Sequence, residues 1–127
     1  MTTTAVRTTP IAARLGVALV VAALLNGVIA LVASALDADG IGMGLQPQVF
    51  LPATVVGVLL GTLGWFGVRR VAPRALPVVV PIVLALTWIP DLLLFGQGAT
   101  VANVVGLMAM HAVVATTVVV ALRPTTR

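Results

Sequence analysis

Residues 15–36 read LGVALVVAALLNGVIALVASAL, an apolar run that contains no charged side chain. An α-helix rises 1.5 Å per residue, so this run forms a helix about 33 Å long, enough to cross a hydrocarbon core of about 30 Å. The stretch therefore predicts a membrane-spanning helix.

Three more runs of this kind follow, at residues 49–68, 75–95 and 100–122. A segment in lipid must satisfy its own backbone hydrogen bonds, which favours helices even where valines are frequent. The alternating pattern of a membrane β-barrel is missing. We therefore expect an all-α protein, an integral membrane four-helix bundle that forms one domain over residues 15–122. Three prolines in the third run, Pro77, Pro81 and Pro90, are expected to interrupt its helix.

The charged residues predict how the chain is threaded. All seven basic residues are arginines, and all lie on one side of the pattern: Arg7 and Arg14 before the first run, Arg69, Arg70 and Arg74 between the second and third, and Arg123 and Arg127 after the fourth. Arginine near span ends is retained in the cytoplasm. The N and C termini, as tails 1–14 and 123–127, are therefore expected to be cytoplasmic.

The composition excludes a water-soluble globule, because only 8% of the 127 residues are charged and 61% are hydrophobic. The net charge of +4 does not indicate a nucleic-acid partner, since the arginines lie at span ends and suit anionic headgroups. We expect a multi-pass protein of the cell (plasma) membrane, with the lipid bilayer as its partner. The absence of lysine and glutamate is typical of a GC-rich bacterial genome, which suggests a bacterial inner membrane.

The residue inventory also limits the chemistry. With no cysteine, no glutamate and one histidine, the chain lacks the ligands of a typical zinc site. It has one serine with no base near it in sequence, and no glycine-rich phosphate loop. We therefore predict no metal, no cofactor and no catalytic residues of a familiar kind.

The first run has a second interpretation. Ala33-Ser34-Ala35 matches the small-residue pattern of a signal-peptidase site, and cleavage after Ala35 would remove this helix. A signal sequence has an apolar core of about 7–15 residues, however, and this run is longer, which favours a retained span.

Small residues predict where helices meet, because helices in lipid associate through close backbone approach. The second run carries Gly57 and Gly61 in a GxxxG pattern that Gly64 extends. The first run offers a similar stripe of Gly16, Ala23, Gly27, Ala30 and Ser34. Such faces serve either packing within the bundle or a dimer, so a homo-oligomer or a membrane-protein partner stays open.

Two ionisable residues lie inside spans, where they are costly and mark candidate functional sites. By depth, His111 lies level with Asn26, and Asp91 lies level with Thr54 and Asn103. Thr87 shares a helix face with Asp91, one turn before it. We predict a ligand-binding pocket open to the outer leaflet, built from Thr87, Asp91, Asn103 and the carbonyl of Leu86 that Pro90 leaves free, with Asn26 and His111 beneath it.

A purely structural role is the alternative for both residues, with Asp91 capping the hairpin and His111 bonded to Asn26. Asn103 and His111 are about 12 Å apart along the helix axis. We therefore expect no direct contact between Asp91 and His111, but a shared cavity bridged by Asn103, Thr87 or water.

The sequence Trp88-Ile89-Pro90-Asp91, followed by a short turn and Met108-Ala109-Met110-His111, resembles a family of uncharacterised four-span membrane proteins of high-GC bacteria. The resemblance implies a membrane protein and no established activity. The span count is also similar to that of small multidrug transporters, but those depend on a glutamate in the first span, where this chain has Asn26.

Three functions are consistent with these patterns. The first is a structural or accessory membrane protein that binds a partner through its glycine faces. The second is a transporter or binder of a small molecule or lipid, which uses a polar pocket around Asp91 and His111. The third is an intramembrane enzyme with these two residues as an acid/base pair.

The threading can be tested with reporter fusions. We expect reporters in the 37–48 and 96–99 loops to be external, and reporters at both termini and at residue 72 to be cytoplasmic, because of the arginine distribution. An external reporter at residue 72 would contradict this topology.

Overall fold

The computed structural model describes residues 9–124, and the regular structure in this range is helical throughout. The long helices are α1 (Ile11–Leu36), α2 (Pro47–Val71), α3 (Leu76–Leu93) and α4 (Val101–Leu122). Short 3₁₀ turns, η1 (Pro73–Ala75) and η2 (Leu94–Gln97), extend α3 at its two ends. Four helical segments are long and apolar enough to cross a membrane, so the prediction of an all-α protein with four spans is confirmed.

The helices extend somewhat beyond the runs read from sequence. Helix α1 begins at Ile11, so residues 11–14, assigned to the tail by sequence, are helical. Helix α3 continues through Pro81 and Pro90, against the expectation that prolines interrupt it. Prolines are tolerated in membrane helices because neighbouring groups satisfy the freed backbone carbonyls.

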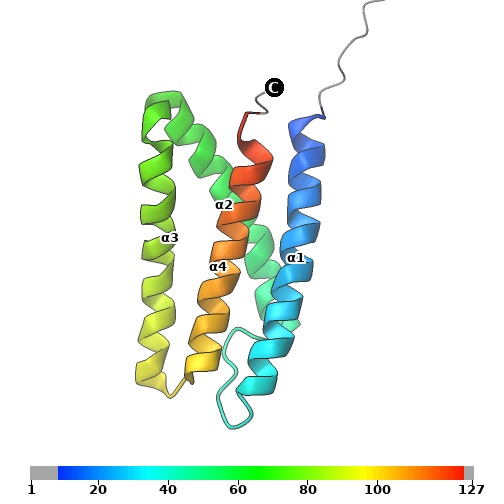
Figure 1. Ribbon diagram of the computed structural model, residues 1–127, viewed down its shortest axis with the longest axis vertical. Coiled ribbons are helices and arrows are strands. Elements are labelled where there is room, and N and C mark those ends of the chain that lie inside the picture. Colours follow the sequence, from blue (N-terminus) through cyan, green and yellow to red (C-terminus); the bar gives the residue numbers. More distant parts are fainter. Residues whose placement is uncertain (1–8, 125–127) are drawn as a thin grey trace, which may run out of the picture.

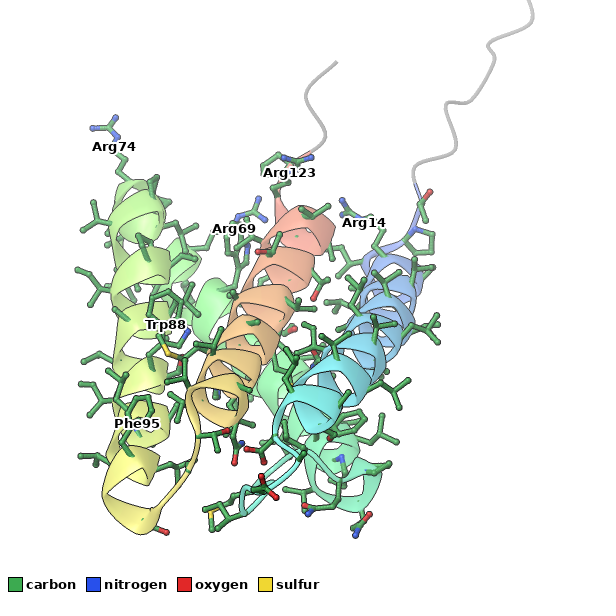
Figure 2. All side chains as sticks on the ribbon, turned by 60° about the horizontal axis from the view of Figure 1, so that its bottom comes forward. Arg14, Arg69, Arg74, Trp88, Phe95 and Arg123 are labelled. Carbon is green, nitrogen blue, oxygen red and sulfur yellow. The ribbon has the colours of Figure 1, made fainter. Side chains whose placement is uncertain are left out.

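The four helices run up and down, with α1 and α4 side by side and α3 on the far side of α4 (Figure 1). Figure 2 shows Arg14, Arg69, Arg74 and Arg123 gathered at one end, here called the arginine end. The connections at residues 37–46 and 98–100 lie at the other end, here called the loop end. Arg7 and Arg127 lie outside the described residues.

Helices α1 and α4 approach each other closely through small side chains. Every buried residue of α1 except Asn26 is an alanine: Ala18, Ala22, Ala30 and Ala33. Opposite them, Gly106 of α4 leaves so little room that an added Cβ atom would lie 2.8 Å from the Cβ of Ala33. This contact is the kind of close packing that membrane helices use in place of hydrophobic burial.

The stripe expected on α1 was therefore largely wrong. Gly16 and Gly27 have open space where a Cβ would lie, and Ser34 is exposed. The buried residues of α1 follow one another at steps of three and four from Ala18. The expected stripe had a near-heptad spacing, and on a straight helix residues at that spacing drift around the axis, away from the buried face.

The glycines of α2 pack against α4. A Cβ at Gly57 would lie 3.1 Å from Val114, and one at Gly61 would lie 3.5 Å from Val118. Gly64 has open space instead. The first two glycines thus serve packing within the chain.

The loop between α1 and α2 folds back onto the helices. Leu45 is buried in a cluster with Ala30, Ala33, Phe50 and Met110. The loop end is therefore closed by an apolar side chain from the loop.

Two glycine substitutions test the contact between α1 and α4. Gly106→Ala should be less stable than Gly27→Ala by about 1–3 kcal/mol, because its new methyl group meets the immobile Cβ of Ala33. Both substitutions raise helix propensity by a similar amount, so the difference in stability between the two variants measures the cost of the new packing contact. Reversible unfolding in mixed detergent micelles measures it, and equal stabilities would contradict the close contact.

Candidate functional site

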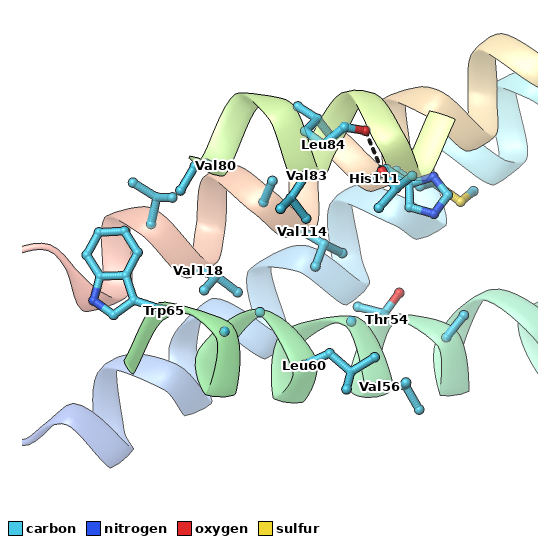
Figure 3. A pocket seen from close by; sticks show the side chains of 18 of the residues that line it. Thr54, Val56, Leu60, Trp65, Val80, Val83, Leu84, His111, Val114 and Val118 are labelled. Carbon is cyan, nitrogen blue, oxygen red and sulfur yellow. Dashed lines mark hydrogen bonds between the residues drawn. The ribbon is translucent and has the colours of Figure 1, made fainter. Parts of the chain in front are cut away.

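A groove of about 620 Å³ lies between α2 and α3, with α4 as its floor. Its lining is almost wholly apolar, with valines and leucines from all three helices. Trp65 lies at one end of the groove and Thr54 and His111 lie at the other (Figure 3). The groove forms because α3 packs mainly against α4 and stands away from α2, as Figure 1 shows.

Apart from Trp65, the polar side chains of the lining gather in the half nearer the loop end. They are Asn26, Thr54, Thr87 and His111, contributed by all four helices. The structure thus brings three of the five residues of the predicted pocket into one groove. Asp91 lies behind His111, and Asn103 belongs to a different cluster.

Asp91 and His111 are in direct contact, with Oδ2 of Asp91 2.8 Å from Nδ1 of His111. The expectation of a cavity without direct contact was therefore wrong. Asp91 is buried, whereas the His111 side chain is 41% exposed and lines the groove. The histidine covers the carboxylate and presents its own ring to the groove.

The direction of side chains on antiparallel helices explains this contact. Each Cα–Cβ bond tilts toward the N-terminus of its own helix. Asp91 therefore leans toward the arginine end, and His111 leans toward the loop end. The two side chains approach each other and close the axial gap that residue spacing alone suggests.

The contacts of His111 define its hydrogen-bonding state. Its Nδ1 atom lies 2.9 Å from the carbonyl oxygen of Leu107, in addition to its contact with Asp91. A carbonyl oxygen only accepts hydrogen bonds, so Nδ1 carries the proton and donates. In a neutral imidazole, Nε2 is then a hydrogen-bond acceptor, and no described residue bonds to it.

Asn26 and Thr54 form a buried chain of hydrogen bonds between α1 and α2. Nδ2 of Asn26 donates to Oγ1 of Thr54 at 2.9 Å, and that hydroxyl donates to the carbonyl of Phe50 at 2.7 Å. Oδ1 of Asn26 is buried and has no partner among the described residues. The bond from His111 to Asn26 that the structural alternative proposed is not formed, since His111 bonds Leu107 and Asp91.

Thr87 and Trp88 of α3 each donate one hydrogen bond. Thr87 donates to the carbonyl of Leu84 at 2.6 Å, within its own helix. The indole of Trp88 donates to the carbonyl of Met108 at 3.0 Å, which ties α3 to α4. Leu86, whose carbonyl was expected in the pocket, is exposed and does not line the groove.

Asn103 binds the loop between α1 and α2, so its assignment to the pocket was wrong. Its Oδ1 accepts from the backbone N–H of Met43 at 3.0 Å, and its Nδ2 donates to the Met43 carbonyl at 2.8 Å. Both glycines beside Met43, Gly42 and Gly44, have positive φ, which orients this backbone unit. The backbone N–H and C=O of a loop residue have no partners in a helix. A side-chain amide has one donor and one acceptor group, so it can pair with both, and this is why Asn103 turns to the loop.

Asp37 joins Asn103 and Thr100 in a set of polar contacts with the loop between α1 and α2, here called the loop clamp. The sequence patterns did not predict it. Its carboxylate accepts from the hydroxyl of Thr100 and from the backbone N–H of Gly42, the latter at 2.9 Å. The Thr100 hydroxyl in turn caps α4 by accepting from Asn103 N–H. The sequence features that could have indicated the clamp are Gly42 and Gly44 in the loop and Thr100, three residues before Asn103.

Within residues 9–124, no cluster of three or more histidine, cysteine, aspartate or glutamate side chains could hold a metal ion. Four apolar helices indicate a multi-pass membrane protein, and the groove is its candidate functional site. The chain belongs to a family of unknown function, DUF6069, whose model matches residues 6–127. No curated protein and no solved structure matches it.

The loop clamp can be tested with a cysteine probe, since the chain has no cysteine of its own. In a Leu45→Cys background, Asn103→Leu should raise the rate of maleimide labelling about tenfold or more, because Met43 loses both partners, each bond being worth about 1 kcal/mol. Asn26→Leu, the same change at a buried site away from the loop, is the control. Equal labelling rates in the two variants would exclude the clamp.

Proposed function

We propose that this protein binds a lipid-soluble small molecule in the groove between α2 and α3. The observation that carries the proposal is the position of His111, which Asp91 holds at 2.8 Å on the wall of an apolar groove. The molecule would enter sideways from the bilayer, because the groove lies between two helices rather than inside a closed bundle.

The size and lining of the groove support a ligand site. Pockets for small molecules are about 300–1,000 Å³ in volume and mostly apolar, with a few convergent polar groups that orient the ligand. The groove has a volume of about 620 Å³, and its polar side chains other than Trp65 converge from four helices on one end. An apolar body would lie along α2, with its polar group near His111.

The cost of the Asp91–His111 pair also supports a role beyond packing. Ionisable groups in a membrane span are expensive, and neutral groups such as Asn26 and Thr54 already link helices here. Trp88 separately ties α3 to α4. Other hydrogen bonds thus already link the helices, so the Asp91–His111 pair is not needed for that purpose. The pair places the His111 ring on the wall of the groove.

The accessory function rests on the glycine faces of α1 and α2. Beside Gly16 and Gly27 of α1 there is open space that a partner helix could use. On the α2 face, Gly57 and Gly61 pack against Val114 and Val118 of the same chain. Gly64 is open, yet it lines the groove. The face thus belongs to the groove and to internal packing.

Two leucines of α3 provide a matched test. Leu84 lines the groove, whereas Leu86 on the same helix is exposed and does not. Leu84→Trp should fill the groove and reduce co-purified ligand about 5-fold to 150-fold, the loss expected from overpacking of about 1–3 kcal/mol. Leu86→Trp should retain the ligand.

The measurement is untargeted mass spectrometry of small molecules that co-purify with each variant in polymer-bounded discs of native membrane. A molecule enriched over bulk lipid in wild type and Leu86→Trp, and depleted in Leu84→Trp, is the expected result. The same small-molecule profile in all three proteins would count against a ligand site in the groove.

A further inference from the structure

Hydrogen-bond acceptors outnumber donors at the polar end of the groove. The hydroxyl hydrogens of Thr54 and Thr87 are already given to the carbonyls of Phe50 and Leu84. Oδ1 of Asn26, a residue only 1% exposed, has no partner among the described residues. A buried acceptor without a partner is costly, particularly where no water is available.

The orientation of the Asn26 amide follows from its neighbour. The single hydrogen of Thr54 is used on Phe50, so Thr54 can only accept from Asn26, which requires Nδ2 on that side. One hydrogen of this amide is the donor left over at this end. Three acceptors at this end have no described donor, namely Oδ1 of Asn26, the Thr87 hydroxyl oxygen and Nε2 of His111.

His111 adds the most accessible of these acceptors. Its Nδ1 atom donates to the Leu107 carbonyl, with Oδ2 of Asp91 2.8 Å away, so the ring in its neutral form offers the lone pair of Nε2. Its side chain is 41% exposed and lines the groove, whereas Asn26 and Thr54 are buried.

We propose that the ligand carries a hydroxyl group, as a lipid-soluble phenol or alcohol does, and donates it to Nε2 of His111. This inference rests on the proposed function and specifies its ligand class. The Asn26 amide lies on the same groove as a second polar contact for the hydroxyl group.

Other head groups fit this end less well. A ketone or ester brings another acceptor and leaves the existing acceptors unpaired. An ammonium would find no carboxylate, because Asp91 is 6% exposed and lies outside the lining. An anionic group would suit the arginine end, which is the opposite end of the groove.

The length of the apolar part of the groove indicates how long the apolar tail of the ligand would be. From Thr54 to Trp65, α2 advances about 16 Å at 1.5 Å per residue. Valines and leucines line this length on α3 and α4. A medium-length alkyl or isoprenoid tail would fill it, which makes 4-dodecylphenol a suitable probe.

The decisive experiment compares two probes that differ in one hydrogen-bond donor. 4-Dodecylphenol and its methyl ether, 4-dodecylanisole, are added to the full chain in nanodiscs, and bound probe is counted by native mass spectrometry. Wild type should bind the phenol about tenfold more tightly, since one hydrogen bond in a membrane is worth about 1–2 kcal/mol.

The variant His111→Phe combined with Asp91→Leu keeps an aromatic ring and leaves no buried carboxylate without its partner. It should bind both probes equally, at the affinity of wild type for the ether. Leu86→Phe, outside the groove, should keep the preference for the phenol.

Nitrogen NMR of the single histidine gives a readout on the wild-type chain. Nδ1 should be protonated, and the Nε2 resonance should move with the phenol and stay fixed with the ether. A proton on Nε2 in the neutral ring would overturn the inference.

The failures of the two proposals are distinguishable. Equal affinity of wild type for both probes, or a preference that survives in the double variant, would overturn the hydroxyl class and leave a groove that binds apolar molecules. Binding of neither probe would overturn the proposed function as well.

Discussion

Helix α4 is the element on which the rest of the structure depends, because each of the other helices is placed by a specific contact with it. Ala33 of α1 meets Gly106 at a distance that excludes a larger side chain. Gly57 of α2 meets Val114, and Trp88 of α3 bonds the Met108 carbonyl. In lipid, where apolar surface gains little from association, such close or polar contacts decide which helices meet.

The groove follows from this arrangement. Close packing of α1 and α2 on α4 leaves α3 to be held mainly by α4, so α2 and α3 stand apart and an apolar space remains between them. Most polar groups around that space are satisfied by other described residues. At the polar end, the atoms without a hydrogen-bond partner are acceptors, namely Oδ1 of Asn26 and Nε2 of His111, with Oδ2 of Asp91 behind the histidine. The unpaired indole N–H of Trp65, a donor, lies at the other end of the groove. A site that is short of donors selects for a ligand that supplies one.

Residue spacing along one helix predicted some parts of the site and missed others. Asn26, Thr87 and His111 line one groove. Asn103 has a similar depth to Asp91, yet it pairs with Met43 in the loop. Depth gives only the position along the membrane normal, whereas the rotation of each helix and the path of the loop decide which residues meet.

The sequence by itself determined the helical class and the number of spans, because a chain in hydrocarbon must satisfy its backbone locally and each apolar run is long enough to cross. It also separated the arginines from the aspartates. Only the tertiary structure decided that Asp91 touches His111, since that contact depends on two side chains that lean toward each other from antiparallel helices. The loop clamp of Asp37, Thr100 and Asn103 likewise joins residues far apart in sequence, and no local pattern encodes such a meeting.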